Sequence, residues 1–464
     1  MTTSLPNHLR NYLPIYLWKL LTPTKTSKRL VQQQSDLEQE IPDRVDERSE
    51  AESSIVESNT EIAKIMLPRS GPVAKEERNM ENLRSIQLIK KSDNEGSTGP
   101  ALLDKDKAEY FGARMLAYLN SGALAMLISI GHKLGLFEAM AKLPAVTSVE
   151  LAQTTELHER YVREWLAAMY VGGILDLEEK RNSKQQDNRY SLPREHAAFL
   201  TWGRGPENVA VLTQYISILS SFEDRTMECF RSGKGIPNSE FGELKSIMAA
   251  DSAQTIASSL IGWILPLGQS MIVQDLRAGI DVLDVECGTG INLMTMAKEF
   301  PKSWFTGYDT NPALIAAAKE AAEKEKLQNV RFKCSQVTDS SESSAYDLVT
   351  CFGGLVETGD VKNVVRRIYQ ALRRGGTFLL QDVASDSDVR ANRSHPAGCL
   401  LYSISLMFSL PTTIDKTGRE EDAVGVMWGN DVALSIIRDV GFKCDGMKRL
   451  SDDNCNAFFF CTRD

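Results

Sequence analysis

The chain has 464 residues, which is long for one domain and predicts two or three. Its hydrophobic content of 42% is ordinary for a globular protein, so enough apolar side chains are present to build a core. The net charge of −9 argues against broad affinity for a nucleic-acid backbone, which requires basic surface, although a local basic face stays compatible with it.

Cysteine usage bears on metal binding and on the cellular compartment. All eight cysteines lie between Cys229 and Cys461, without a C-x-x-C pair and without a histidine cluster. We therefore predict no metal site and no redox dithiol. Dispersed single cysteines indicate buried thiols in a reducing compartment, so we expect a cytoplasmic protein.

The composition of the N-terminus leaves a second cellular compartment open. No acidic residue precedes Asp36, while five lysines and arginines do, a pattern typical of an organelle transit peptide. Pro6 and Pro14 interrupt any long helix there, so a plain tail and a mitochondrial signal both stay open. No apolar run approaches the roughly 18 residues that indicate a membrane span.

Residues 1–107 read as a disordered leader. Segments such as SDLEQEIPDRVDERSEAESS are rich in charged and polar residues and show no sustained apolar period. Such segments cannot bury enough apolar surface to offset the entropy of ordering.

Residues 108–205 are expected to form a mainly helical winged-helix domain. Thr147 and Ser148 are candidate N-caps with Glu150 close behind, and HERYVREWLAAMYV ends at the Gly172-Gly173 pair. ILDLEEKRNSKQQDNRYSLP then reads as two short strands around a polar tip, which is a wing.

The predicted winged helix has a mixed charge on the helix that would enter a DNA groove. Glu156, Glu159 and Glu164 stand there beside Arg160 and Arg163. This favours a structural role, in dimerisation or in covering a substrate, so a homodimer stays open as a partner arrangement.

Residues 206–268 are predicted to be a helical linker or cap, and residues 269–464 an α/β domain. Runs such as DVLDVE, WFTGYD and YDLVTCF alternate with helical runs such as INLMTMAKEF and VKNVVRRIYQALRR. This rhythm predicts a Rossmann-like, mostly parallel sheet of seven strands. GFKCDGMKRL and NAFFFCTRD lack an intervening helix and predict an antiparallel hairpin at the end.

A nucleotide-type cradle follows the first of these strands. VLDVECGTG runs from a buried strand into a turn, where Gly288 and Gly290 permit close approach to a ligand. Asp309, at the end of the next strand, suits a grip on ribose hydroxyls. A dinucleotide fingerprint would continue to a third glycine, but Leu293 stands at that place, which disfavours NAD and FAD.

The pattern resembles motif I of the class I S-adenosylmethionine (SAM) methyltransferases, usually D-x-G-x-G-x-G. YDLVTCF, LRRGG and TFLLQD resemble the later motifs of that family, with Arg374 at a place where it usually has proline. Together with LNSGALAMLISIGHKLGLFEAM and ERYVREWLAAM, residues 108–464 resemble bacterial and animal methyltransferases that carry a winged helix. Plant-type small-molecule O-methyltransferases share this plan more distantly.

The resemblance implies a SAM site and a set of residues for it. Asp284, Gly288 and Gly290 would hold the methionine part, Asp309 the ribose, Gln336 with Val337 the adenine, and Cys351 would line the methyl-transfer mouth.

Three departures fall in the expected active site. Glu286 replaces the first glycine of the turn; it would face either the carboxylate or the amino group of SAM, and we expect weaker but retained binding. Val356 stands where relatives carry a basic histidine, and Phe408 stands in place of an expected His-Cys pair. Glu357 and His395 are the remaining candidate bases.

These patterns lead to two hypotheses. The first is a SAM-dependent methyltransferase acting on a small-molecule acceptor. The second is a catalytically inactive scaffold or SAM sensor that dimerises through the winged-helix region.

Overall fold

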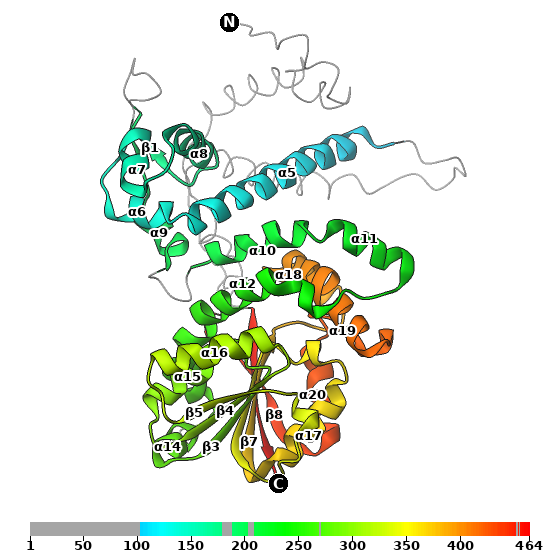
Figure 1. Cartoon of the computed structure of the whole chain (residues 1–464). Helices are drawn as coiled ribbons and strands as arrows, with labels where there is room; N and C mark the ends of the chain where they lie inside the picture. The colour runs from blue at the N-terminus through cyan, green and yellow to red at the C-terminus, as the bar shows by residue number, and fades with distance from the viewer. Residues whose placement is uncertain (1–102, 179–187, 203–207, 269–270, 452, 454) are drawn as a thin grey trace, which may run out of the picture. The chain divides into compact units, whose positions relative to one another are not determined.

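The computed structural model describes residues 103–464 except residues 179–187, 203–207, 269–270, 452 and 454 (Figure 1). The leader predicted over residues 1–107 lies almost entirely outside the described residues, as does the tip of the predicted wing. The first helix begins at Lys105.

The described chain begins with the predicted winged-helix domain. Its elements are α5 (Lys105–Lys133), α6 (Leu136–Lys142), α7 (Ser148–Thr155), α8 (Glu159–Val171), β1 (Asp176–Leu177), β2 (Tyr190–Ser191) and α9 (Arg194–Leu200). α7 starts at a capping box, in which Thr147 accepts from the Glu150 N–H and the Glu150 carboxylate accepts from the Thr147 N–H. β1 and β2 pair antiparallel, as expected for the two sides of a wing.

Helix α5 is long and apolar enough to cross a bilayer by length and composition alone. Its best window has a mean hydropathy of 1.3, and 6% of that window is buried. The end of the helix nevertheless packs inside the protein: the Trp165 indole donates to the Leu127 carbonyl, and His132 is buried and hydrogen-bonded to Gln214 and Asn208. The absence of a membrane span therefore stays a prediction.

A run of helices, which we call the cap, joins the winged helix to the sheet. Its elements are α10 (Ala210–Ser220), α11 (Glu223–Ser232), η4 (Asn238–Phe241), α12 (Gly242–Ser252), η5 (Ala253–Ala257), η6 (Leu260–Ile264) and α13 (Leu265–Leu267). An apolar cluster that includes Tyr215, Phe241 and Leu244 holds the cap together. The non-helical segment after α11 docks on a later part of the chain, where the Ile236 N–H donates to the Pro411 carbonyl.

The rest of the chain is a seven-stranded α/β domain, as predicted. Its strands are β3 (Asp281–Val285), β4 (Trp304–Asp309), β5 (Val330–Cys334), β6 (Tyr346–Phe352), β7 (Leu372–Val383), β8 (Phe442–Lys448) and β9 (Asn456–Arg463). They lie in the order β5-β4-β3-β6-β7-β9-β8. β3 to β7 are parallel, and β9 is antiparallel to both β7 and β8.

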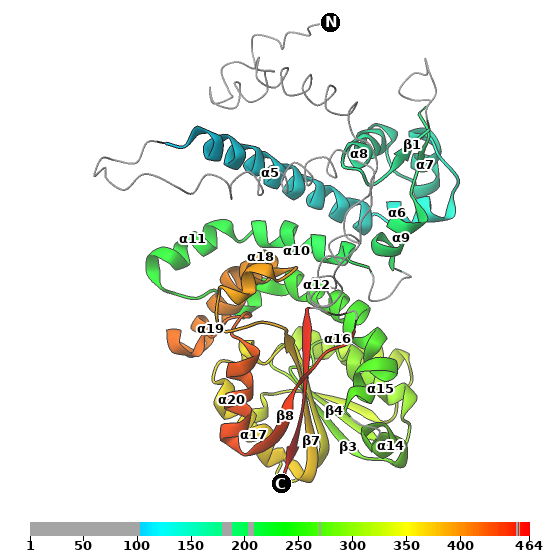
Figure 2. The same ribbon diagram turned by 180° about the vertical axis from the view of Figure 1, so that it is seen from behind.

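Helices cover both faces of this sheet, which explains the continuous apolar runs of its central strands (Figures 1 and 2). α14 (Met271–Ala278), α15 (Ile291–Glu299) and α16 (Pro312–Lys324) share one core, while α17 (Val361–Ala371) and α20 (Asn430–Val440) share the other. In α17, Val361, Val364, Val365 and Ile368 recur at helical spacing and form its buried face.

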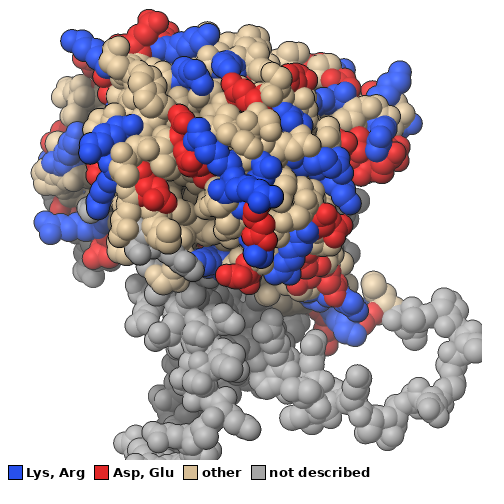
Figure 3. Space-filling model, turned by 90° about the horizontal axis from the view of Figure 1, so that it is seen from below, with Lys and Arg blue, Asp and Glu red and all other residues tan. Residues whose placement is uncertain are grey.

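A second group of helices follows β7 and packs against the cap. It comprises η9 (Ala391–Ser394), α18 (Gly398–Ile404), η10 (Ser405–Ser409), α19 (Leu410–Thr417) and η11 (Glu420–Asp422). α19 also reaches the loop after β6, because the Thr413 hydroxyl donates to the Val356 carbonyl. On the face seen in Figure 3, basic and acidic side chains are interspersed.

Candidate functional site

The strand order creates a crevice at the ends of β3 and β6. The chain runs outward from β3 through β4 to β5, and then returns to place β6 on the other side of β3. At such a switch point the connections diverge, and open α/β sheets bind ligands outside the carboxyl ends of the strands there. The turn after β3 (residues 286–290) and the loop after β6 (residues 353–359) therefore form the walls of the candidate site.

The glycine turn has the backbone conformation expected of a cradle. Gly288 and Gly290 have φ values of 55° and 73°. A Cβ on Gly290 would stand 2.4 Å from the Phe332 ring, so glycine is required there by both space and conformation. A Cβ on Gly288 would meet nothing within 4 Å, so open space adjoins the turn at that residue. α15 begins directly after the turn and adds the free N–H groups of its first residues.

Asp309 stands beside this turn, as the sequence spacing predicts. Its Oδ2 accepts from the Gly288 N–H at 2.9 Å, and its Oδ1 accepts from the Asn311 N–H at 2.7 Å. The side chain is buried. These two bonds fix the carboxylate at the end of β4, and each oxygen keeps a lone pair that could accept from a ligand hydroxyl.

Glu286, the residue that breaks the motif, lies in the crevice. Its φ is 57°, a conformation that favours glycine. A Cβ placed on Gly354 would be 2.6 Å from the Glu286 Cβ, so the absence of a side chain at Gly354 makes room for Glu286 between the two strand ends. Burial raises the pKa of Glu286 to about 7, and the Asp309 charge adds to the rise, while Lys416 and Lys245 oppose it.

Two more charged side chains surround the same space. Glu357 lies in η8 (Val356–Thr358), and burial, reinforced by the Glu286 charge, raises its pKa to about 8. Lys245 reaches in from α12, and burial lowers its pKa against the attraction of Asp309, Glu286 and Glu357. Within the described parts of the chain, the side chains of Glu286, Glu357 and Lys245 have no ion pair and no hydrogen bond to a neighbouring residue.

The cap contributes an acid with a phenolic partner. The Tyr215 hydroxyl donates to Asp251 Oδ2 at 3.2 Å, and burial raises the pKa of Asp251 to about 6. Burial is the main cause of the raised pKa of Tyr215, and the charges of Asp251 and Glu357 add to it. Sequence reasoning missed Lys245, Tyr215 and Asp251, because no motif marks them on the cap helices.

Several predicted residues lie behind the site rather than in it. Asp284 is 1% exposed and accepts from the Thr350 hydroxyl at 2.7 Å, and burial raises its pKa to about 7. Cys351 is fully buried, and Val337 belongs to the same apolar core. Cys351 belongs to the core, and its predicted place at the methyl-transfer mouth stays a prediction.

Gln336 borders a cavity of about 340 Å³ beside the crevice. Its side-chain oxygen accepts from the Thr338 hydroxyl at 3.1 Å. The other lining residues come from the loop after β6, from α17 and from the end of α19: Thr358, Asp360, Asn363, Val364, Lys416 and Thr417. The cavity offers hydroxyl, amide and carboxylate groups to a polar ring.

His395 and Phe408 are not brought to the acidic side chains. His395 Nδ1 accepts from the Ala397 N–H at 3.1 Å within its own loop, and its pKa is lowered by burial and by Arg449. None of its recorded interactions involves Glu286 or Glu357. Phe408 packs on Phe241 in the apolar cluster of the cap, with ring centroids 4.9 Å apart.

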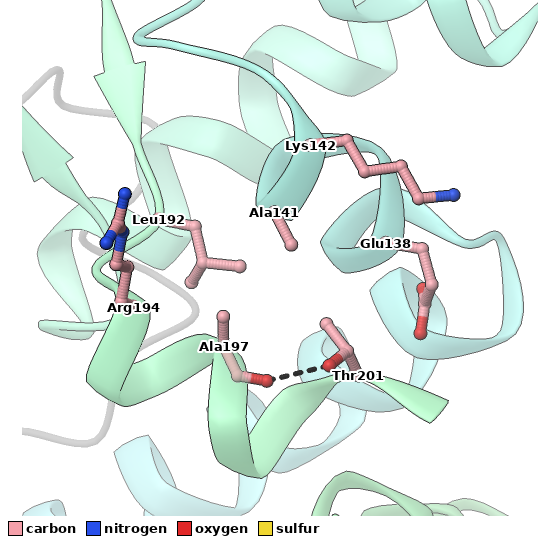
Figure 4. Close-up of a pocket in the computed structure, with 7 residues that line it drawn as sticks. All are labelled: Glu138, Ala141, Lys142, Leu192, Arg194, Ala197 and Thr201. Carbon is pink, nitrogen blue, oxygen red and sulfur yellow. Dashed lines mark hydrogen bonds between the residues drawn. The ribbon is translucent and has the colours of Figure 1, made fainter. Parts of the chain in front are cut away.

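A separate cavity of about 490 Å³ lies inside the winged-helix domain (Figure 4). Its residues come from α6, from α9 and from the segments that flank α9: Glu138, Ala141, Lys142, Leu192, Arg194, Ala197 and Thr201. Glu138 is engaged there by the Trp202 N–H at 2.9 Å. This cavity shares no residue with the crevice.

The strand order, the glycine turn after β3 and the carboxylate of Asp309 together define a class I methyltransferase fold, which a winged helix precedes in the chain. Residues 276–417 match the family model described as a methyltransferase domain, and residues 122–202 match the Rv2258c-like winged HTH domain. The chain thus combines these two domains.

Curated proteins are similar to parts of this chain. Trans-aconitate 2-methyltransferase of Deinococcus radiodurans is 30% identical over 30% of this chain and 52% of its own length. An uncharacterized protein of Rickettsia prowazekii is 33% identical over 20% of this chain and 37% of its own. The chain therefore spans about a third to a half of the length of these curated relatives.

Solved structures share the fold over most of the chain. Human N-acetylserotonin methyltransferase in complex with SAM has a TM-score of 0.55 at 15% identity, covering 80% of this chain and 99% of that one. Mitomycin 7-O-methyltransferase has a TM-score of 0.54 at 14% identity, covering 77% and 99%. At these identities the likeness concerns the fold.

Proposed function

We propose that the protein is a SAM-dependent methyltransferase with a small-molecule acceptor. The observation that carries the proposal is the carboxylate of Asp309, held 2.9 Å from the Gly288 N–H beside a glycine turn that opens onto free space. This geometry at a switch point provides acceptors for ribose hydroxyls and donors for a carboxylate. The relatives named above are methyltransferases where their activity is stated, which supports the same assignment.

The residues fit the chemical groups of SAM in three regions. Asp309 would hold the ribose, the cavity beside Gln336 has polar groups for adenine, and the turn from Glu286 to Gly290 would meet the amino-acid end. SAM supplies a methyl group on a positively charged sulfur. The protein has to orient the acceptor in line with that carbon and exclude water, which are the roles that a cap over the crevice can fill.

Two acids are candidates to receive the acceptor proton. Glu357 and Asp251 both have raised pKa values, about 8 and about 6, and lie on opposite walls of the site, the sheet and the cap. A carboxylate with a pKa near the working pH is an effective general base. Val356 cannot act in this way, and its main chain instead anchors α19 through Thr413.

A small acceptor is favoured by the surroundings of the crevice. The cap, α19 and the loop after β6 contact one another through the Ile236–Pro411 and Thr413–Val356 hydrogen bonds, so three segments adjoin the site. The named relatives act on small molecules by their titles, trans-aconitate and N-acetylserotonin among them.

One observation favours the second candidate, an inactive scaffold or SAM sensor. Glu286 occupies part of the crevice with a carboxyl group, in a backbone conformation that glycine would adopt without strain. A site that has lost catalysis could retain such a residue. The two candidates differ in whether methyl transfer follows SAM binding.

Calorimetric titration of the full chain with SAM tests the proposal. We expect binding by the wild-type protein and at least about tenfold weaker binding by Asp309→Asn, which keeps the side-chain shape but loses the charge. Exposed Glu299→Gln on α15 is the matched control. No binding by the wild type would refute the proposal.

Methyl-labelled SAM with a protein-free metabolite extract separates the two candidates. Label transferred to a small molecule supports the enzyme, and binding without any transfer supports the sensor. Transfer to a separately supplied protein extract, without transfer to the metabolite extract, would contradict the small-molecule acceptor.

A further inference from the structure

The charges around the crevice are unbalanced and unpaired. Glu286 comes from the glycine turn, Glu357 from the loop after β6, and Lys245 from α12 of the cap. Each is half-buried, and none has an ion pair or hydrogen bond to another described residue. Burial without partners disfavours the charged form of such groups, and a ligand that supplies the opposite charges would stabilise it.

The other acids of the site are already engaged. Asp309 accepts from two backbone N–H groups, and Asp284 accepts from Thr350. Asp382 accepts from the Trp428 indole at 2.7 Å. Among the half-buried side chains, two carboxyl groups and one ammonium are therefore left to meet a ligand, while the Lys416 ammonium, which also acts on Glu286, is exposed to solvent.

The complement of this set is a ligand with two positive charges and one negative charge. The amino-acid end of SAM has this pattern, since it carries a sulfonium, an ammonium and a carboxylate. S-adenosylhomocysteine (SAH) differs by one neutral thioether in place of the sulfonium. We propose that Glu286, Glu357 and Lys245 read the charges at this end, so that the site selects the sulfonium donor over its thioether product. The inference rests on the proposed function.

Glu286 and Lys245 have separable tasks in this arrangement. Glu286, between the ends of β3 and β6, faces the positive charges, and a glycine in its place would leave that wall neutral. Lys245 faces the carboxylate, which SAM and SAH share. Loss of Glu286 charge should therefore change the ratio of the two affinities, whereas loss of Lys245 should weaken both ligands alike.

The selection should depend on pH. The groups that face Glu286 are Asp309 from β4, Lys416 from α19, Lys245 from α12 and Glu357 from η8. The pKa of Glu286 is raised to about 7 and that of Glu357 to about 8, so both carboxylates are charged at pH 9 and largely neutral at pH 6. The preference for SAM over SAH should grow between these values.

Calorimetric titration at pH 6 and pH 9 with SAM, SAH and sinefungin tests the inference. Sinefungin carries an ammonium on carbon where SAM has the sulfonium. For the wild type at pH 9 we expect SAM and sinefungin to bind at least about tenfold more tightly than SAH. One ion pair of low solvent exposure contributes a difference in affinity of about this size. Glu286→Gln should bring the three affinities together, and Lys245→Met should weaken all three without changing their ratio.

The outcomes separate this inference from the proposed function. If the wild type binds SAH as tightly as SAM, or if Glu286→Gln leaves the ratio unchanged, charge reading is refuted while SAM binding stands. If neither ligand binds to the wild type or to Glu286→Gly, both ideas fail. Circular dichroism confirms that each variant is folded, and Glu299→Gln should behave as the wild type does.

Discussion

Replacing Glu286 with glutamine should stabilise the ligand-free protein at alkaline pH. An ordinary glutamate has a pKa of 4.5, and burial beside Asp309 raises that of Glu286 to about 7. The folded state therefore holds a proton that the unfolded chain has released, so the contribution of Glu286 to stability is most favourable below pH 4.5 and falls as the pH rises to about 7. The cost above pH 7 is about 3 kcal/mol at most, and roughly 2 kcal/mol after allowance for the solvent contact of the side chain.

Thermal and urea unfolding at pH 4.5 and pH 8.5 measure this effect. Glu286→Gln should raise the stability by about 2 kcal/mol at pH 8.5, which shifts the unfolding midpoint of a domain of this size by roughly 4 to 8 °C. At pH 4.5 the variant and the wild type should differ by less than about 0.5 kcal/mol. Exposed Glu299→Gln should change neither value. Equal stabilisation at both pH values would show that packing, and not the buried charge, is the cause.

Three other substitutions test the packing around the two domains. Gly354→Ala places a Cβ 2.6 Å from that of Glu286 and should cost about 2 kcal/mol in urea unfolding, most of which Glu286→Gly should restore in the double variant; equal stabilities of the single and double variants would contradict the contact. Burial lowers the pKa of His132 to about 4, so the contribution of His132 to stability should fall by about 2 kcal/mol between pH 7 and pH 5, and the difference between the unfolding curves of the wild type and His132→Phe should change by that amount, whereas a difference independent of pH would refute it. Thr147→Ala should lose about 1 kcal/mol of thermal stability with the capping box while Thr147→Ser retains it, and an unchanged midpoint for Thr147→Ala would refute the cap.

The fold and the centre of the site follow from local patterns in the sequence. Alternating apolar strands and amphipathic helices predict the parallel sheet, because each of those periods is set by one element alone. The glycine pair and the acid nineteen residues later mark two neighbouring strand ends, and the structure places Asp309 at the Gly288 N–H. Short-range spacing suffices here because adjacent parallel strands bring their carboxyl ends together.

The other half of the site depends on packing between distant segments. Lys245 is a lysine on a helix, a residue that in isolation reads as solvated, and Asp251 and Tyr215 meet only because α10 packs on α12. The orientation of Cys351 depends on the same kind of packing: its position near the end of β6 can be predicted, but the side of the strand that faces the core is decided by the helices that cover the sheet.

Glu286 shows how these two sources of information combine. Considered in the turn alone, a glutamate in place of glycine is unfavourable, because its side chain adds volume, backbone strain and negative charge. In the structure the volume is matched by Gly354 on β6's loop, and the charge is opposed by Lys245 of the cap and Lys416 of α19. Compensation that comes from three separate segments argues that the crevice is a binding site of altered charge. Under the proposed charge reading, the cap takes part in ligand recognition through Lys245 as well as covering the site, and a ligand would have to satisfy both walls at once.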